Sequence, residues 1–314
     1  MLPERTCKTL SIDFTGRVAV VTGAGGGLGR SHALLLAARG AKVVVNDIGG
    51  AVGGTGTDAT PADRVVEEIR AAGGEAVANY DSVSDPAGAA RIVQTAVDSF
   101  GTLDILINNA GILRDKSFGK TDLADFRAVL EVHLLGTVYC THAAWPVMNA
   151  AKYGRIVVTT SIAGTSGNFG QSAYGTAKLG MVGLMNSLAI EGARNNVLVN
   201  AISPGAATRM TDGLNPPALD KYLHAELVSA GVAYLASEEC TATGQILQAV
   251  AGGYARLHMF ETEGVQFDPA EPLTPEMVAD RYEEIADLKT ATPTTPGIAG
   301  RTEQRLRAIG RWDD

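Results

Sequence analysis

Three side chains that could transfer a proton lie close together in the sequence: Ser161, Tyr174 and Lys178. Tyr174 and Lys178 are four residues apart, so one turn of a helix would place both on the same face. A lysine charge about 4 Å from the tyrosine oxygen stabilises the phenolate by about 4 kcal/mol at an effective dielectric constant of about 20, which lowers the tyrosine pKa by about three. Because Ser161 could hydrogen-bond a substrate oxygen beside Tyr174, the three residues predict acid–base catalysis on a carbonyl or a secondary alcohol.

The spacing of Tyr174 and Lys178 is common in helices, but a glycine-rich turn far upstream makes it more informative. Residues 18–29 read VAVVTGAGGGLG, an apolar run that leads into glycines and then into a helical pattern. Gly23 permits a tight turn, Gly27 lets the backbone approach a pyrophosphate, and Gly29 lets helix and strand pack closely. The helix N-terminus would present free N–H groups to the phosphates. This order predicts a dinucleotide site rather than a merely flexible turn.

An acidic residue at the end of the second apolar run predicts which dinucleotide binds. Asp47 stands where a carboxylate meets the ribose hydroxyls of the adenosine, and it would repel a 2′-phosphate. No lysine or arginine follows at Ile48, so the sequence predicts NAD as the cofactor. The glycine-rich stretch Gly49–Gly56 could be a second phosphate loop. We interpret it instead as a mobile connection near the adenosine end, because a chain of this size has one such crevice.

Short apolar runs alternate with helical patterns along most of the chain. Seven runs are expected to be strands: Val18–Thr22, Lys42–Asn46, Glu75–Asn79, Ile105–Asn108, Arg155–Thr160, Leu198–Ile202 and Gln245–Ala249. The helical patterns between them include Gly27–Arg39, Ala62–Ala72, Pro86–Phe100, Asp122–Ala151 and Tyr174–Arg194. Such alternation predicts an α/β fold with a Rossmann-type, doubly wound, seven-stranded parallel sheet and a C-terminal extension. Ser161 would then lie at the carboxyl edge of the sheet, where ligands bind.

The domain boundary is expected near residue 255. Residues 1–255 would form the NAD-binding domain with the catalytic site, and residues 256–314 an extension that packs on this domain or on a neighbouring subunit. Beyond Gly253 no strand pattern is visible, but Thr274 is suited to cap a helix over Pro275–Leu288. The helices over Asp122–Ala151 and Tyr174–Arg194 are apolar on more than one face, which predicts a homodimer or homotetramer.

Composition narrows the classes of partner. The net charge of −8 argues against nucleic acid as a partner. The three cysteines, Cys7, Cys140 and Cys240, have no metal-ligand spacing, so neither disulfides nor a metal ion are expected. No apolar run reaches about 18 residues, and the N-terminus lacks the apolar core of a secretory signal. We therefore expect a cytoplasmic protein with no membrane partner.

The motifs together resemble those of the short-chain dehydrogenase/reductase superfamily. The cofactor motif of that family is matched by Thr22-Gly23 and Gly27-Leu28-Gly29, and its catalytic residues by Ser161, Tyr174 and Lys178. The resemblance implies that Tyr174 and Lys178 also contact the cofactor. It further implies cofactor contacts for Leu28, for the adenine-binding residue Asp81, for Asn109, Ala110 and Gly111 of an Asn-Asn-Ala-Gly motif, and for Pro204 and Gly205 beside the nicotinamide.

A narrower resemblance covers nearly the whole chain. Stretches such as VVNDIGG at 44–50 and GNFGQSAYGTAKLG at 167–180 are similar to the dehydrogenase unit of peroxisomal multifunctional enzymes of type 2, the 17β-hydroxysteroid dehydrogenase type 4 group. This resemblance implies oxidation of a (3R)-hydroxyacyl-CoA or a hydroxysteroid. His133 stands where many superfamily members carry an asparagine of the proton relay, so His133 is a further candidate catalytic residue. The chain ends at Asp314 without a peroxisomal address, and we expect a stand-alone, bacterial-type enzyme.

Two other functions remain open on the same fold. A 3-oxoacyl thioester reductase is disfavoured by Asp47, because that reaction usually draws on NADPH. A catalytically silent NAD-binding sensor is disfavoured by the presence of all three proton-handling residues. Arg114, Lys116 and Arg209 could meet a phosphate of a CoA-linked small-molecule substrate, although ordinary solvated charges explain them equally well. Residues 206–222, with Met210 and Leu214, are expected to form a lid.

Overall fold

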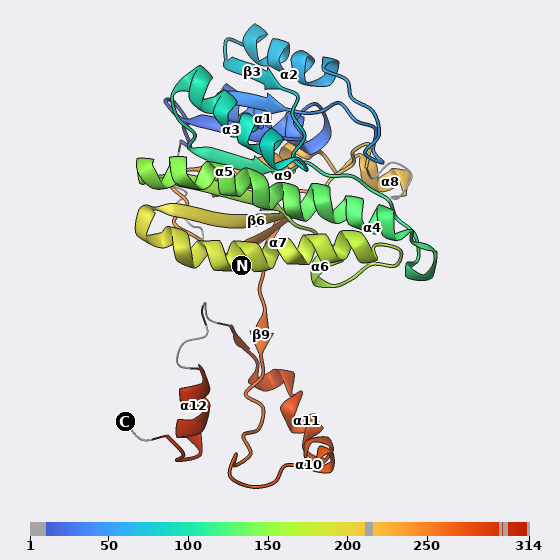
Figure 1. Cartoon of the computed structure of the whole chain (residues 1–314), viewed down its shortest axis with the longest axis vertical. Helices are drawn as coiled ribbons and strands as arrows, with labels where there is room; N and C mark the ends of the chain where they lie inside the picture. Colours follow the sequence, from blue (N-terminus) through green and yellow to red (C-terminus); the bar gives the residue numbers. More distant parts are fainter. Residues whose placement is uncertain (1–10, 211–215, 295–296, 298–300, 313–314) are drawn as a thin grey trace, which may run out of the picture. The chain divides into compact units, whose positions relative to one another are not determined.

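The computed structural model describes residues 11–210, 216–294, 297 and 301–312 (Figure 1). Cys7 and Leu214, which the sequence analysis named, lie outside the described residues. The chain divides into two compact units, residues 1–256 and residues 257–314.

One large sheet forms the centre of the first unit. Its strand order is β3-β2-β1-β4-β5-β6-β7-β8, and the strands from β3 to β7 pair in parallel. The strands are β1 (Val18–Thr22), β2 (Lys42–Asn46), β3 (Glu75–Asn79), β4 (Ile105–Asn108), β5 (Gly154–Thr159), β6 (Val197–Gly205), β7 (Ile246–Val250) and β8 (Gly253–Leu257). The order reverses between β1 and β4, which opens a crevice at their carboxyl ends. The doubly wound α/β fold is confirmed.

The predicted number of strands is wrong by one. The described sheet has eight strands, because β8 extends it beyond β7. Four of the five β8 residues are exposed and the strand carries no buried apolar run, so its sequence has no strand signal.

Helices cover both faces of the sheet (Figure 1). On one face α1 (Gly27–Ala38) lies between α2 (Thr60–Ala71) and α9 (Ala225–Ala236), over a continuous buried apolar cluster. On the other face α5 (Gly136–Ala151) lies between α3 (Pro86–Phe100) and α7 (Ser172–Gly192). None of the helices in the described part of the chain is both long and apolar enough to cross a membrane.

The single helix expected over Asp122–Ala151 is interrupted in the structure. Asp122 caps α4 (Leu123–Leu130) by accepting the N–H of Ala124. A π-helical turn, η2 (Glu131–Leu135), follows before α5 begins. Such wide turns inside helices are frequent at functional sites. In this one His133 is buried.

The second unit contains short elements. These are the antiparallel pair β9 (Phe260–Glu261) and β10 (Thr292–Pro293), with α10 (Pro275–Asp280), α11 (Tyr282–Ile285), η4 (Leu288–Thr290) and α12 (Arg301–Ala308). Thr274 caps α10 as expected, accepting the N–H of Met277. The helix predicted over Pro275–Leu288 is broken at Arg281, and the expectation of no strand beyond Gly253 is wrong.

Candidate active site

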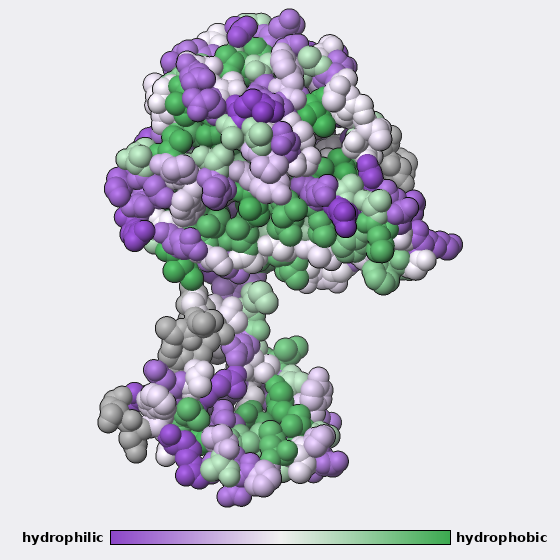
Figure 2. Space-filling view, in the orientation of Figure 1, coloured by the Kyte–Doolittle hydropathy of each residue, from purple (hydrophilic) through white to green (hydrophobic). Residues whose placement is uncertain are grey.

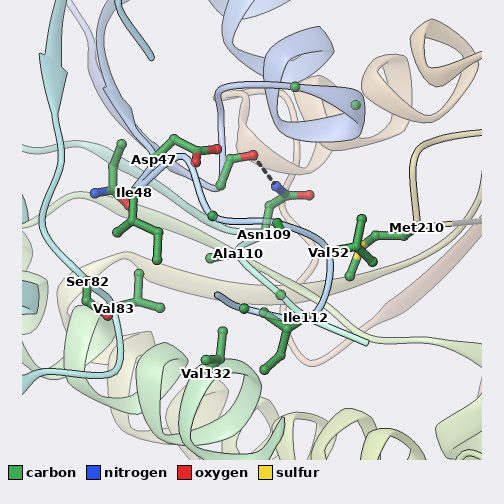
Figure 3. Close-up of a pocket in the computed structure, with 18 of the residues that line it drawn as sticks. Asp47, Ile48, Val52, Ser82, Val83, Asn109, Ala110, Ile112, Val132 and Met210 are labelled. Atoms are coloured by element: carbon green, nitrogen blue, oxygen red, sulfur yellow. Dashed lines mark hydrogen bonds between the residues drawn. The ribbon is translucent and has the colours of Figure 1, made fainter. Parts of the chain in front are cut away.

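The glycine-rich turn after β1 forms one wall of a pocket at the carboxyl edge of the sheet (Figure 3). Gly23 and Gly27 line it, and both have positive φ angles, 65° and 53°, which glycine adopts without strain. Leu28 lines it as well, in the first turn of α1. Gly29 does not. A Cβ atom there would lie 2.2 Å from the carbonyl oxygen of Gly23, so Gly29 lets helix and turn pack closely.

Asp47, just after β2, is fixed by two backbone donors. Its Oδ2 accepts the N–H of Gly25 at 2.8 Å, and its Oδ1 accepts the N–H of Gly49 at 2.7 Å. The carboxylate lines the pocket beside the glycine turn. Among the pocket-lining residues that the structure describes, the single cation is Arg209.

Asp81 lies at the same pocket with Ser82 and Val83. Its carboxylate is already partnered. It pairs with Arg91 at 2.6 Å, and it accepts a hydrogen bond from Asn79 Nδ2 at 3.0 Å. These contacts hold the segment after β3 in place beside the pocket.

The segment that follows β4 is tied to the glycine turn. Asn109 Nδ2 donates to the carbonyl oxygen of Thr22 at 2.9 Å. It also donates to the carbonyl oxygen of Gly23 at 3.1 Å (Figure 3). The hydroxyl of Thr22 in turn accepts the backbone N–H groups of Asn109 and Ala110. Asn109, Ala110, Gly111 and Ile112 all line the pocket.

Ser161, Tyr174 and Lys178 come together at the end of β5. Ser161 caps α6 (Ile162–Thr165) by accepting the N–H of Ala163, and it lies near Tyr174 in the first turn of α7. Lys178 lies one turn later, is 2% exposed, and donates from Nζ to the carbonyl oxygen of Thr159 at 2.5 Å. Its Nζ is 5.2 Å from the centre of the Tyr174 ring.

Burial has the largest effect on the pKa values of both Lys178 and Tyr174. It lowers the pKa of Lys178 to about 7. Burial also raises the pKa of Tyr174 to about 12, although the nearby Ser161 side chain acts in the opposite direction. The lowered tyrosine pKa expected from the sequence is therefore wrong for the protein alone, because burial removes the water that would stabilise a phenolate.

His133 connects this group to the pocket. Its Nε2 lies 3.0 Å from the backbone nitrogen and 2.8 Å from the backbone oxygen of Ile112. Burial, and secondarily the charge of Lys178, lower the pKa of His133 to about 3, so the ring is neutral near pH 7. Its Nδ1 has no hydrogen-bond partner among the described residues. A neutral ring bonded to backbone is suited to holding Ile112 and Tyr174 in place rather than to carrying charge.

Pro204 and Gly205, at the end of β6, do not line the pocket. Gly205 is needed where it stands, because a Cβ atom would lie 2.4 Å from Val250 Cγ2. The residues just beyond them line the pocket instead, namely Thr208, Arg209 and Met210. A Cβ atom on Gly26 would lie 3.8 Å from Arg209 Nη2, so this guanidinium lies over the glycine turn.

Several residues that line the pocket were not expected from the sequence. The apolar lining residues Val52, Val83, Ile112 and Val132 could have been indicated only by their positions next to recognised motifs.

Two of the three cations considered for a CoA phosphate are already paired: Arg114 and Lys116 both form ion pairs with Asp125, at 2.9 and 3.1 Å. Across the described residues, no cluster of three or more His, Cys, Asp or Glu side chains is placed to hold a metal ion.

Comparisons with known proteins agree with this geometry. Residues 17–218 match the short chain dehydrogenase family. The chain is 51% identical over 280 residues to peroxisomal multifunctional enzyme type 2 of Drosophila melanogaster, covering 88% of this chain and 46% of that enzyme. It is also 51% identical, over 275 residues, to a putative short-chain type dehydrogenase/reductase of Mycobacterium tuberculosis, covering 88% of this chain and 96% of that protein.

Two solved structures are similar as well. The full-length Drosophila enzyme superposes with a TM-score of 0.79 at 43% identity, over 95% of this chain and 50% of that one. The chain thus spans about half the length of this relative. A 7α-hydroxysteroid dehydrogenase complexed with NADH and 7-oxo glycochenodeoxycholic acid gives a TM-score of 0.70 at 29% identity, over 77% of this chain and 96% of that one.

Proposed function

The chain belongs to the short-chain dehydrogenase family of oxidoreductases, and we propose that it is an NAD-dependent enzyme that interconverts a secondary alcohol and a ketone, with a (3R)-hydroxyacyl-CoA as the substrate. One observation carries the proposal. Ser161 and Tyr174 lie together at the end of β5, where Ser161 acts to lower the pKa of Tyr174, and the Nζ of buried Lys178, one helical turn away, is 5.2 Å from the centre of the Tyr174 ring. Tyr174 packs against the cluster of Ile112, Val129 and Ala173, and Ile112 lines the pocket of the glycine turn.

The residues around the pocket fit a nicotinamide dinucleotide. The free N–H groups at the start of α1 and the guanidinium of Arg209 would hold the phosphates, and Asp47 would bind the adenosine ribose. When bound, the dinucleotide supplies the hydride acceptor. Asp47 favours NAD, because its fixed carboxylate would lie near a 2′-phosphate.

The chain's own residues handle the proton. Ser161 Oγ hydrogen-bonds the substrate oxygen and holds it beside the Tyr174 hydroxyl. Tyr174 then removes the hydroxyl proton in the oxidation direction and returns it in reduction. Lys178, whose Nζ lies 5.2 Å from the centre of the Tyr174 ring, is placed to supply positive charge that stabilises the tyrosinate.

A hydroxysteroid is the second candidate substrate. The specific reason is the similarity to the 7α-hydroxysteroid dehydrogenase solved with NADH and an oxo bile-acid conjugate. Fold and catalytic residues do not separate a steroid from an acyl thioester. The higher identity to the multifunctional enzyme favours the thioester.

We also propose a homo-oligomer. Large apolar side chains are exposed on the α4–α7 face, including Leu135, Leu179 and Ile190. Figure 2 shows apolar residues gathered over α4 and α7. Burying them between subunits would remove apolar surface from water. Light scattering at micromolar concentration should give a mass of at least a dimer; a monomer mass would contradict the proposal.

Substrate oxidation tests the proposed activity. The purified protein is mixed with NAD or NADP and with (3R)-hydroxyacyl-CoAs, (3S)-hydroxyacyl-CoAs and hydroxysteroids, and the absorbance of the reduced cofactor is followed. We expect turnover of the (3R) thioester with NAD. Turnover of steroids alone would support the second candidate, turnover with NADP alone would overturn the role of Asp47, and no turnover would favour a silent NAD-binding protein.

A further inference from the structure

Residues 49–58, here called the strap, connect β2 to α2 and form a second wall of the pocket. Gly50, Ala51, Val52 and Gly54 of the strap line it. Figure 3 shows Val52 on the side of the pocket away from Asp47. The strap therefore reaches much further than the adenosine end, to which the sequence analysis had confined it.

Both ends of the strap are fixed at the base of the pocket. The N–H of Gly49 donates to Asp47 Oδ1 at 2.7 Å, and the N–H of Asp58 donates to the carbonyl oxygen of Ile48 at 2.8 Å. Half of the residues between and including these ends are glycines. Because glycine loses the most conformational freedom on ordering, a segment of this composition depends on its anchors to stay closed.

The tip of the strap is held by the segment that follows β4. The backbone N–H of Leu113 donates to the carbonyl oxygen of Val52 at 3.0 Å. Arg114 Nε donates to the carbonyl oxygen of Gly53 at 2.9 Å, and a Cβ atom on Gly54 would lie 3.0 Å from Ile112 Cγ2. The tip is therefore bonded across the pocket, at a site remote in sequence.

Arg114 is itself held in position. Its Nη1 donates to Asp125 Oδ1 of α4 at 2.9 Å, and the side chain is 26% exposed. The guanidinium thus joins three parts of the chain: the strap, the segment after β4, and α4. Lys116 pairs with the other oxygen of Asp125 at 3.1 Å, and its ammonium has no recorded bond to the strap.

We propose that the strap retains the bound dinucleotide and that Arg114, as a positioning residue, latches it closed. The inference rests on the proposed NAD binding. A dinucleotide between the glycine turn and the strap would be covered on the strap side, so its release should be faster when the strap separates from the segment after β4. Removing the latch should therefore act mainly on the rate of cofactor dissociation rather than on the proton-transfer residues.

Stopped-flow fluorescence of bound NADH, displaced by excess NAD, measures that rate. Arg114→Gln should raise the dissociation rate about tenfold, equivalent to about 1.4 kcal/mol, and Asp125→Asn should raise it less. Lys116→Gln is the matched control, because it removes a partner of Asp125 without a recorded contact to the strap, and its rate should equal the wild-type rate. Hydrogen exchange of peptides covering the strap gives a second readout: NADH should protect them in the wild type and protect them less in Arg114→Gln.

Three results would overturn the proposal in distinguishable ways. A folded Arg114→Gln variant with wild-type dissociation and strap protection would show that Arg114 is no latch. An equal increase in Lys116→Gln would place the effect in α4 rather than in the strap. If the wild-type protein bound neither NADH nor NADPH, the proposed function itself would fall, and the strap's role with it.

Discussion

The imidazole of His133 lies edge-on against the phenol ring of Tyr174, with the ring centres 5.2 Å apart and the planes at 89°. The same imidazole is hydrogen-bonded to the backbone of Ile112, which lines the pocket. Gly111 leaves the space for this ring, since a Cβ atom there would lie 2.2 Å from His133 Cε1. One neutral, buried side chain thus joins the proposed proton-transfer residue to the proposed cofactor wall.

Replacing His133 should weaken both stability and catalysis. His133→Ala leaves a cavity beside Tyr174 and removes the hydrogen bond to Ile112, so we expect the free energy of unfolding to fall by about 3 kcal/mol. We expect kcat/KM to fall by about tenfold or more, because a misplaced catalytic group is costly. Urea unfolding and steady-state kinetics measure the two effects. Full activity in a destabilised variant would show that the ring is structural only.

Two buried histidines should make the protein sensitive to mild acid. Burial lowers the pKa of both His32 and His133 to about 3, from 6.5. Between these values the unfolded chain binds a proton at each site and the folded chain does not, so stability is present above pH 6.5 and is lost as the pH falls. Where a histidine is fully protonated in the unfolded chain, the free energy of unfolding falls by about 1.4 kcal/mol for each pH unit of acidification. This limit is approached below about pH 6.

The window from pH 6.5 to 5 isolates the histidines, because carboxylates there are still mostly ionised. Urea unfolding across this window should show a steep fall in stability for the wild type and about half that slope for His32→Asn. His32 is a suitable choice because its Nδ1 hydrogen-bonds Ser229 Oγ at 2.7 Å and neither residue lines the pocket. A flat wild-type profile would contradict the burial argument.

Features of the site that depend on residues close together in the sequence could be predicted from it. The glycine turn, Asp47, and the pair Tyr174 and Lys178 each follow from a local spacing on a strand end or a helix. The π-turn that buries His133 could not be predicted, since its residues have ordinary helical character. The strap's anchors at Leu113 and Arg114 are more than fifty residues away from it, and no periodicity encodes them. The direction of the Tyr174 pKa was missed because burial is a property of the assembled fold.

Asp47 should control the choice of cofactor. Asp47→Asn removes the negative charge and leaves one of the N–H groups of Gly25 and Gly49 without its carboxylate acceptor. We expect the ratio of kcat/KM with NAD to that with NADP to fall by at least about tenfold, a difference of about 1.4 kcal/mol. Asp81→Asn is the comparison, since Asp81 lines the same pocket but is paired with Arg91. An unchanged ratio in Asp47→Asn, or an equal change in Asp81→Asn, would place cofactor selection elsewhere.

Tyr174→Phe tests whether this hydroxyl carries the proton. Phenylalanine keeps the ring that packs against His133, so the fold and the binding of NADH should persist. The loss of the acid–base group should lower kcat by about 10² to 10⁴-fold. Tyr153→Phe is the matched control: Tyr153 is also buried, but it lies between Arg17 and Arg155, beside the first residues of β5 rather than at its carboxyl end. Its kcat should equal that of the wild type. Substantial turnover by Tyr174→Phe would mean that another group, or water, transfers the proton, whereas wild-type turnover that is lost only in Tyr174→Phe would exclude the silent-sensor alternative.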